Sequence, residues 1–159
     1  MNFEFSETDI ELRKAVKTFT DKEIRPLAKK IDEDEEIPRE LITKIGEMGL
    51  LGTAFPEQYG GGGYGEIGFC IAQEEVTKGC GSTATMIGAH QSIGTNAIYI
   101  GGSEELKQKY LPDLTSGKKI ASFVLTEPNA GSDTFNLQTS AKLDGNKWIL
   151  NGEKMWITN

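Results

Sequence analysis

The first part of the chain carries apolar residues at the spacing of an amphipathic helix. After Ser6, which has Asp9 three positions later as in a capping box, apolar side chains recur at helical intervals as far as Ile31. Pro26 has no N–H group to donate and clashes with the preceding turn, so it should kink or divide the helix. The pattern predicts a capped first helix that is interrupted near Pro26.

Further segments show the same helical periodicity. They span residues 38–48, 66–78, 83–100 and 103–114. Pro38 suits the first position of the earliest of these helices, and Gly49 suits its C-terminal cap. Ser103 is a favourable N-cap for the last one. Helices of these lengths joined by short loops predict an all-α bundle.

After Gly117 the pattern changes to one typical of strands. Residues 119–126 (KIASFVLT) form a compact apolar run, and the pairs Asp144-Gly145 and Asn151-Gly152 mark turns between later runs suited to strands. A sheet of so few strands would have open hydrogen-bonding edges and little core. For this reason we expect either that the chain is part of a longer protein or that another chain completes the sheet. We therefore expect an α+β fold: an N-terminal helical bundle at residues 1–118, then the first strands of a truncated, antiparallel, β-barrel-like domain at residues 119–159.

The composition and charge of the chain argue against nucleic-acid binding and against a metal site. The 159 residues carry a formal net charge of −7, and adjacent lysines occur only as isolated pairs, so a nucleic-acid role is disfavoured. The acidic run at residues 32–36 is typical of a solvated helix end, and we predict no metal site there.

The cysteines and the N-terminus bear on location. Cys70 and Cys80 are too few and too far apart for a disulfide framework or a redox motif, so we expect two buried thiols in a reducing compartment. The N-terminus lacks a signal-peptide core and the character of a transit peptide, and no segment is apolar enough to cross a bilayer. We expect a cytoplasmic prokaryotic protein with no integral membrane segment.

Two features that resemble functional motifs have simpler interpretations. Gly60, Gly62 and Gly65 satisfy the dinucleotide-binding pattern G-x-G-x-x-G, but they join two predicted helices instead of a strand and a helix, which favours a loop. His90 lies on an apolar helical stripe with no spaced metal ligand and no nucleophile nearby, so we expect a hydrogen-bonded core histidine.

Two segments carry more specific chemistry. In VLTEPNAGSD (residues 124–133) an apolar run ends at Thr126, and a small-residue turn with Ser132 follows. In KMWITN (residues 154–159) a second apolar run carries Trp156 and ends at Thr158. Hydroxyl groups can bond the edge of a planar heterocycle, an indole can pack on its face, and a Gly-Ser turn can bind a phosphate tail.

These two segments resemble the paired flavin-binding segments of the acyl-CoA dehydrogenase family. The resemblance extends over essentially the whole chain, because LGTAFPEQYGG (residues 51–61) and QKYLPDLTSG (residues 108–117) also occur in the family's order. Asn129 is one of several residues that the family tolerates at its position. Asn136 departs from the family pattern, which has a small residue there, and this departure affects the exit of the loop.

The resemblance implies FAD as a non-covalent cofactor and acyl-CoA as the substrate, oxidised to a trans-2-enoyl thioester. Thr126 would bond the pyrimidine edge of the flavin, Ser132 would meet the pyrophosphate and lie near the acyl chain, and Thr158 would lie near N5. The resemblance also implies electron-transferring flavoprotein as electron acceptor and a homotetramer for the full-length protein. The implied cofactor-binding residues are Phe123, Val124, Leu125, Thr126, Gly131, Ser132, Trp156, Ile157 and Thr158.

The resemblance leaves the catalytic base outside this chain, since the family takes it from a glutamate in its C-terminal helical domain. Glu127 lies inside the cofactor segment before a proline, where we expect a structural role. Thr85 and Ala89 would line the acyl tunnel, as in members that accept very long chains. Acyl-CoA oxidase and a non-catalytic helical scaffold with the family fold are the alternatives.

Overall fold

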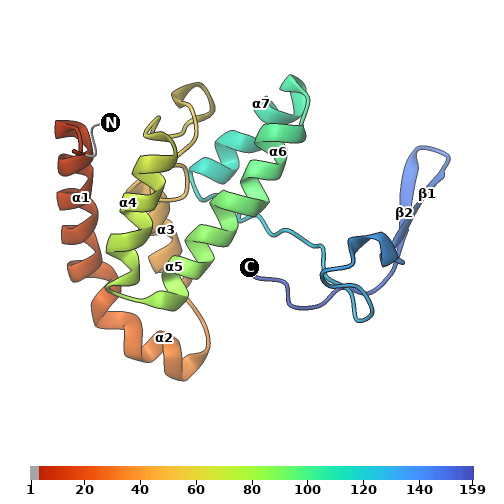
Figure 1. Ribbon diagram of the computed structural model, residues 1–159, viewed down its shortest axis with the longest axis horizontal. Coiled ribbons are helices and arrows are strands. Elements are labelled where there is room, and N and C mark those ends of the chain that lie inside the picture. The colour runs from red at the N-terminus through yellow and green to blue at the C-terminus, as the bar shows by residue number, and fades with distance from the viewer. Residues whose placement is uncertain (1–3) are drawn as a thin grey trace.

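The computed structural model describes residues 4–159, which form a helical bundle followed by an extended segment and a β-hairpin (Figure 1). The α-helices are α1 (Glu7–Phe19), α2 (Ala28–Asp34), α3 (Arg39–Glu47), α4 (Gly65–Thr77), α5 (Gly81–Gly88), α6 (Asn96–Gly101) and α7 (Glu104–Thr115). The strands are β1 (Ser140–Asp144) and β2 (Lys147–Asn151). Shorter π and 3-10 turns occupy Thr20–Ile24, Arg25–Leu27, Glu57–Tyr59, Ala89–Thr95 and Thr134–Asn136. The expected α+β order of a bundle followed by antiparallel strands is confirmed.

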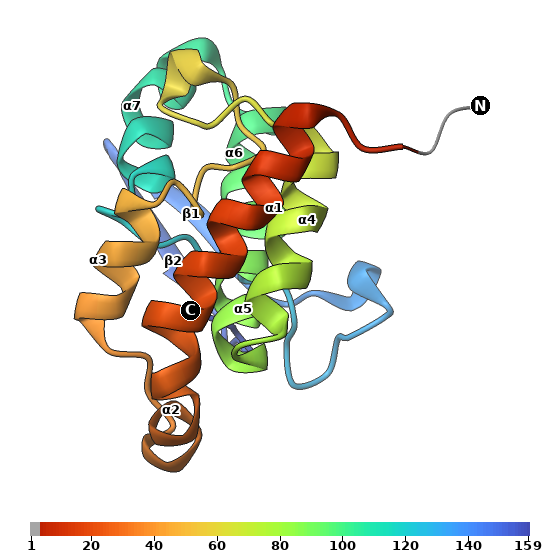
Figure 2. The same ribbon diagram turned by 90° about the vertical axis from the view of Figure 1, so that its left-hand side faces the viewer.

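The bundle core lies where α1, α3, α4 and α5 meet. Helix α1 packs on α4 and α4 packs on α5, as Figure 2 shows from the side of α1. Val16, Ile45, Val76 and Ile87 contribute one fully buried side chain from each of these helices. No helix among residues 4–159 is long and apolar enough to cross a membrane.

The caps predicted from the sequence form as expected. The Ser6 side chain accepts from the N–H of Asp9 while the Asp9 carboxylate accepts from the N–H of Ser6, and the Ser103 side chain accepts from the N–H of Leu106. The helix is also interrupted at Pro26, where a 3-10 turn separates the π turn after α1 from α2. The prediction that Pro38 is the first residue of its helix is wrong, because Pro38 is the N-cap of α3 and the helix begins at Arg39. Its extended backbone, with ψ at 135°, places it just outside the helix.

Gly49 ends α3 in the left-handed conformation, with φ at +78°. Its N–H donates to Gly46 at 2.9 Å and the next N–H, of Leu50, donates to Ile45 at 3.0 Å, which is the Schellman arrangement. Because a Cβ is disfavoured at this φ, Gly49→Ala should lower the free energy of unfolding by about 1 kcal/mol in urea titrations. Gly101→Ala is the control, since it lies in α6 with nothing within 4 Å of an added Cβ, and it should not destabilise. Equal losses for the two variants would contradict this explanation.

The region after residue 118 contains less regular structure than the sequence predicts. In this region only β1 and β2 form a ladder, which is antiparallel, with Asp144 opposite Lys147 across a two-residue turn at Gly145-Asn146. The prediction of strands is wrong for residues 119–126 and 154–159, because both segments are extended but form no ladder. Strands of this kind need neighbours on both sides, and within residues 4–159 each has little beyond the other.

The prediction of two buried cysteines is half correct. Cys80 is buried at 7% exposure, whereas Cys70 is exposed, and both are free thiols. On α4 the neighbouring residue Ile71 faces the core and is buried at 2% exposure. Cys70 lies outside this core-facing side of the helix and is therefore exposed.

Candidate functional site

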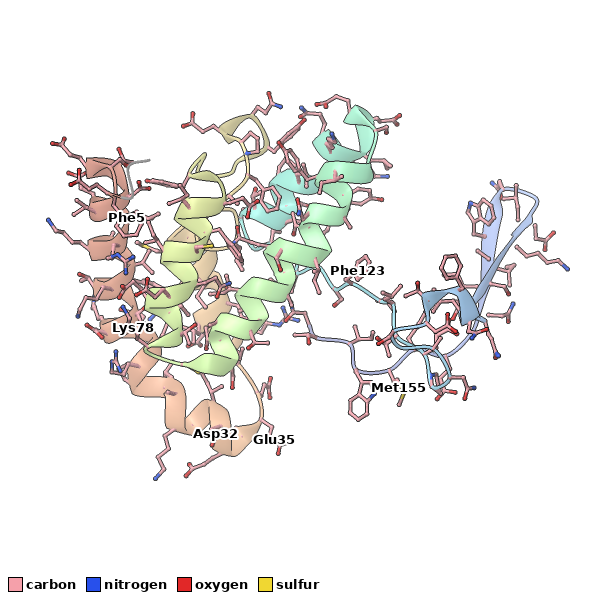
Figure 3. The ribbon with its side chains drawn as sticks, in the orientation of Figure 1. Phe5, Asp32, Glu35, Lys78, Phe123 and Met155 are labelled. Atoms are coloured by element: carbon pink, nitrogen blue, oxygen red, sulfur yellow. The ribbon has the colours of Figure 1, made fainter. Side chains whose placement is uncertain are left out.

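The two segments identified from the sequence lie side by side in antiparallel orientation. The N–H of Met155 donates to the carbonyl oxygen of Thr126 at 3.0 Å, and the Ser122 hydroxyl donates to the carbonyl oxygen of Asn159 at 2.5 Å. Figure 3 labels Phe123 on the first segment and Met155 on the second, in the part of the chain that leaves the bundle. The structure thus brings Thr126 and the Trp156–Thr158 stretch onto neighbouring backbones.

Both segments are attached to the long helical run that contains α5 and the π turn after it. The Asn159 side chain donates to the carbonyl oxygen of Met86 at 3.0 Å, and the N–H of Ala121 donates to Nδ1 of His90 at 3.0 Å. Gly94 allows the first segment to cross this helix closely, since a Cβ there would lie 2.7 Å from the Ala121 Cβ. The bundle therefore fixes one end of the pair of segments.

His90 is the central residue of this attachment and is fully buried. Because Nδ1 accepts from Ala121, Nε2 carries the proton and donates to the carbonyl oxygen of Leu114 at 3.1 Å. Burial lowers the pKa of His90, which keeps the ring neutral in this arrangement. The prediction of a hydrogen-bonded core histidine is confirmed.

Glu127 is buried, with 6% exposure, and lies at the centre of a polar cluster at the end of the first segment. Its carboxylate accepts from the backbone N–H groups of Gln138 at 2.6 Å and Thr139 at 2.9 Å. The Lys154 ammonium lies 2.9 Å from the same carboxylate and also donates to the carbonyl oxygen of Leu125 at 2.7 Å. We call Glu127, Gln138, Thr139 and Lys154 the Glu127 cluster.

The Glu127 cluster should make stability depend on pH. The Thr139 side chain, the Gln138 N–H and the Lys154 ammonium lower the pKa of Glu127 from 4.5 to about 2. Because the folded pKa lies below the unfolded one, the stabilisation is complete above pH 4.5 and is lost as the pH falls toward 2. In urea titrations of the full-length protein, the advantage of wild type over Glu127→Gln should therefore shrink between pH 5 and pH 3. A difference that stays constant across this range would contradict the shifted pKa.

The side chains predicted to meet a cofactor are mostly exposed. Trp156 is 83% exposed with φ at +60°, and Val124 is 52% exposed. Within residues 4–159 the hydroxyl groups of Thr126 and Thr158 form no hydrogen bond. The other members of the two segments are Phe123, which is 43% exposed, and Leu125 and Ile157, which are half-buried.

The turn after the first segment is closed by its own backbone. Glu127 and Ala130 exchange two N–H···O bonds, at 3.0 and 3.2 Å, and this directs the chain into Gly131 and Ser132. Both of these residues are exposed. In the described part of the chain no hydrogen bond or ion pair joins Ser132 to the Trp156–Thr158 stretch.

A groove of about 1110 Å³ runs beside the second segment. Thr85 of α5 and Thr158 both line it, so the structure brings together two residues that the sequence analysis assigned to different ligands. Ala89 lies one turn further along the helix, is half-buried and does not line this groove.

Sequence reasoning missed Lys154 and Asn159. Both act through contacts with residues far away in the sequence, namely Glu127 and Met86. A lysine and an asparagine near an apolar run give no local signal of such pairing. The buried acceptor at Glu127 does have a weak signal, because a carboxylate within a cofactor segment requires a partner.

Comparisons with known proteins agree on one family. The chain matches the family model "Acyl-CoA dehydrogenase, N-terminal domain" over residues 6–118 and "Acyl-CoA dehydrogenase, middle domain" over residues 122–159. It is 47% identical over 159 residues to a probable acyl-CoA dehydrogenase of Bacillus subtilis (strain 168). It is 42% identical over 159 residues to the short-chain specific acyl-CoA dehydrogenase of Clostridium acetobutylicum. Both alignments cover 100% of this chain and 42% of the relative, so the chain spans less than half of their length.

A solved structure gives the same result for the fold. An acyl-CoA dehydrogenase complexed with FAD from Bacillus anthracis superposes with a TM-score of 0.91 at 39% sequence identity. The superposition covers 98% of this chain and 27% of that chain.

Proposed function

Because the chain belongs to the acyl-CoA dehydrogenase family, we propose that it is the N-terminal part of an FAD-dependent acyl-CoA dehydrogenase. In this proposal the full-length protein oxidises an acyl-CoA thioester to its trans-2-enoyl form. The observation that carries the proposal is the side-by-side arrangement of residues 121–127 and 154–159, joined by the Met155–Thr126 bond.

The two segments fit the chemistry of a flavin. An isoalloxazine has a flat apolar face and a polar edge. The chain offers an exposed indole at Trp156 and the hydroxyl groups of Thr126 and Thr158, which form no hydrogen bond within residues 4–159. When bound, FAD would supply the ring that accepts the hydride. The protein's part is to hold that ring and to direct hydrogen-bond donors at the atoms where negative charge develops.

The remaining assignments follow from the matched motif. Phe123, Val124, Leu125 and Ile157 would run along the ring, and Gly131 and Ser132 would meet the pyrophosphate. Ser132, Thr85 and Ala89 would contact the acyl-CoA. The residues near Ala89 resemble those of members that accept very long chains, whereas the Clostridium acetobutylicum relative is named short-chain specific.

No residue of this chain is proposed as the catalytic base. Glu127 is unsuitable because its pKa is lowered to about 2 and its oxygens already accept three donors. A base that removes the proton alpha to a thioester should have a pKa near the working pH. In the proposal this group comes from another part of the full-length protein.

The proposal also covers organisation and partners. Residues 1–118 form the helical domain and residues 119–159 begin the middle β-domain, a division supported by the two matched ranges. The full-length protein is a cytoplasmic homotetramer in a bacterium and passes electrons to electron-transferring flavoprotein.

Anaerobic reduction tests the proposed function against its alternatives. The full-length protein should bind FAD, and an acyl-CoA should bleach the flavin absorbance in the absence of oxygen. On admission of air the flavin should reoxidise slowly, and electron-transferring flavoprotein should accelerate reoxidation. Rapid peroxide formation would indicate an acyl-CoA oxidase instead. A bound flavin that no acyl-CoA reduces would indicate the non-catalytic scaffold.

A further inference from the structure

The two segments of the candidate site lack the ladder of hydrogen bonds that normally fixes the register of neighbouring strands. Between Thr126 and Met155 there is a single backbone bond, and the next connection, from Ser122 to Asn159, involves a side chain. A slip of one residue in an extended segment turns every side chain to the opposite face. Such a slip in residues 154–159 would move Trp156 and Thr158 away from Thr126. Something else must hold the register here.

The Glu127 cluster is placed to do this. Lys154 immediately precedes the residue that bonds to Thr126, and its ammonium bridges the Glu127 carboxylate and the Leu125 carbonyl, on either side of Thr126 in the sequence. One cation therefore joins the two residues on either side of Thr126, Leu125 and Glu127, to the start of the second segment.

The same carboxylate also closes the turn that follows. By accepting from the N–H groups of Gln138 and Thr139, Glu127 joins both ends of the loop at residues 128–137. Gly152 allows Thr139 to approach at this point, because an added Cβ there would collide with the Thr139 side chain. The loop that carries Gly131 and Ser132 thus has both ends held at one buried group.

We propose that Glu127 and Lys154 are positioning residues for the flavin: the ion pair between the buried Glu127 carboxylate and the half-buried Lys154 ammonium sets the register of the two segments without itself contacting the ring. This inference rests on the proposed function for its ligand. It assigns a role to the carboxylate that was excluded as a base and to a lysine that the sequence analysis did not single out.

A role in positioning agrees with the energetics of buried ion pairs. Removing two charges from water costs about as much as their attraction returns, so such a pair adds little stability over apolar side chains of the same size, although removing only one partner is costly. The best-attested use of buried polar groups is to fix register. The bundle offers a matched pair for comparison. Glu75 of α4, at 3% exposure, bridges Arg13 of α1 at 2.7 Å and Lys78, the C-cap of α4, at 2.8 Å, away from both segments.

The test uses the full-length protein and four forms of it: wild type, Glu127→Gln, Lys154→Met and the control Glu75→Gln. Glu127→Gln keeps the side-chain shape but removes the charge. Lys154→Met keeps the stem and leaves Glu127 with its two backbone donors, so this variant should fold even if the first does not. The readouts are the Kd for FAD by fluorescence titration and the flavin midpoint potential at saturating FAD.

Both cluster variants should weaken FAD binding by at least about tenfold, the size of effect typical of residues that orient a ligand's direct contacts. They should also shift the midpoint potential at saturation, because misplaced donors stabilise the reduced ring differently, whereas Glu75→Gln should change neither quantity. The inference is overturned if Lys154→Met matches wild type in both readouts, or if Glu75→Gln weakens FAD binding equally. If wild type itself binds no FAD, the proposed function fails first.

Discussion

Thr158→Val is expected to slow flavin reduction by an acyl-CoA about 100-fold in the full-length protein, the effect typical of removing one donor aimed at developing charge. The substitution keeps the shape of the side chain and removes only the hydroxyl group. That hydroxyl is exposed and forms no hydrogen bond within residues 4–159, so the thermal midpoint without FAD should hardly change. Stopped-flow absorbance under anaerobic conditions measures the rate.

Thr77→Val provides the matched control. Thr77 is a threonine of α4 whose hydroxyl donates to the Gln73 carbonyl at 2.7 Å, outside both segments of the candidate site. The control should reduce its flavin at the wild-type rate. If Thr158→Val also does so, the assignment of Thr158 to the flavin edge is wrong.

His90→Leu is expected to produce the largest loss of stability. The change leaves two buried backbone groups without a partner, the N–H of Ala121 and the carbonyl oxygen of Leu114. Each unpaired group costs about 1 to 3 kcal/mol, so the free energy of unfolding should fall by about 2 to 6 kcal/mol. Urea titration of the full-length protein measures this.

The position of His90 also connects stability to the site. Because its ring attaches Ala121 to the bundle, His90→Leu should increase hydrogen exchange at residues 121–127 more than within α4. Ser92→Ala is the control, since its exposed hydroxyl only donates to the Gly88 carbonyl of the same helix, and it should change stability by less than about 0.5 kcal/mol. A loss below 1 kcal/mol for His90→Leu would contradict the hydrogen-bond assignment.

The bundle could be predicted from the sequence because its signals are local. Ser6, Ser103 and Gly49 each define a helix end through contacts within a few residues, and apolar spacing defines the helices between them. The start of α3 was predicted one residue too early, at Pro38, because the local signal of a proline fits both the first helical position and the residue before it.

The candidate site could be predicted only in part. The hydroxyl and indole residues were identified from their motifs, and the structure places the two segments together. The contacts that hold them together could not be predicted, because Lys154 and Asn159 reach partners distant in the sequence and lie in segments that form no ladder. The strand prediction for residues 119–126 was wrong for the same reason: apolar composition indicates extended backbone, but pairing depends on neighbours that composition does not specify.

Stabilisation by FAD tests the central claim, that residues 121–127 and 154–159 together hold a flavin. The purified full-length protein is freed of cofactor, and its thermal unfolding is followed with and without added FAD. With FAD at about 100 times its Kd, binding to the folded state should add about 2.7 kcal/mol of stability and raise the midpoint, and the protein should turn yellow. A colourless protein whose midpoint does not respond to FAD would contradict the claim.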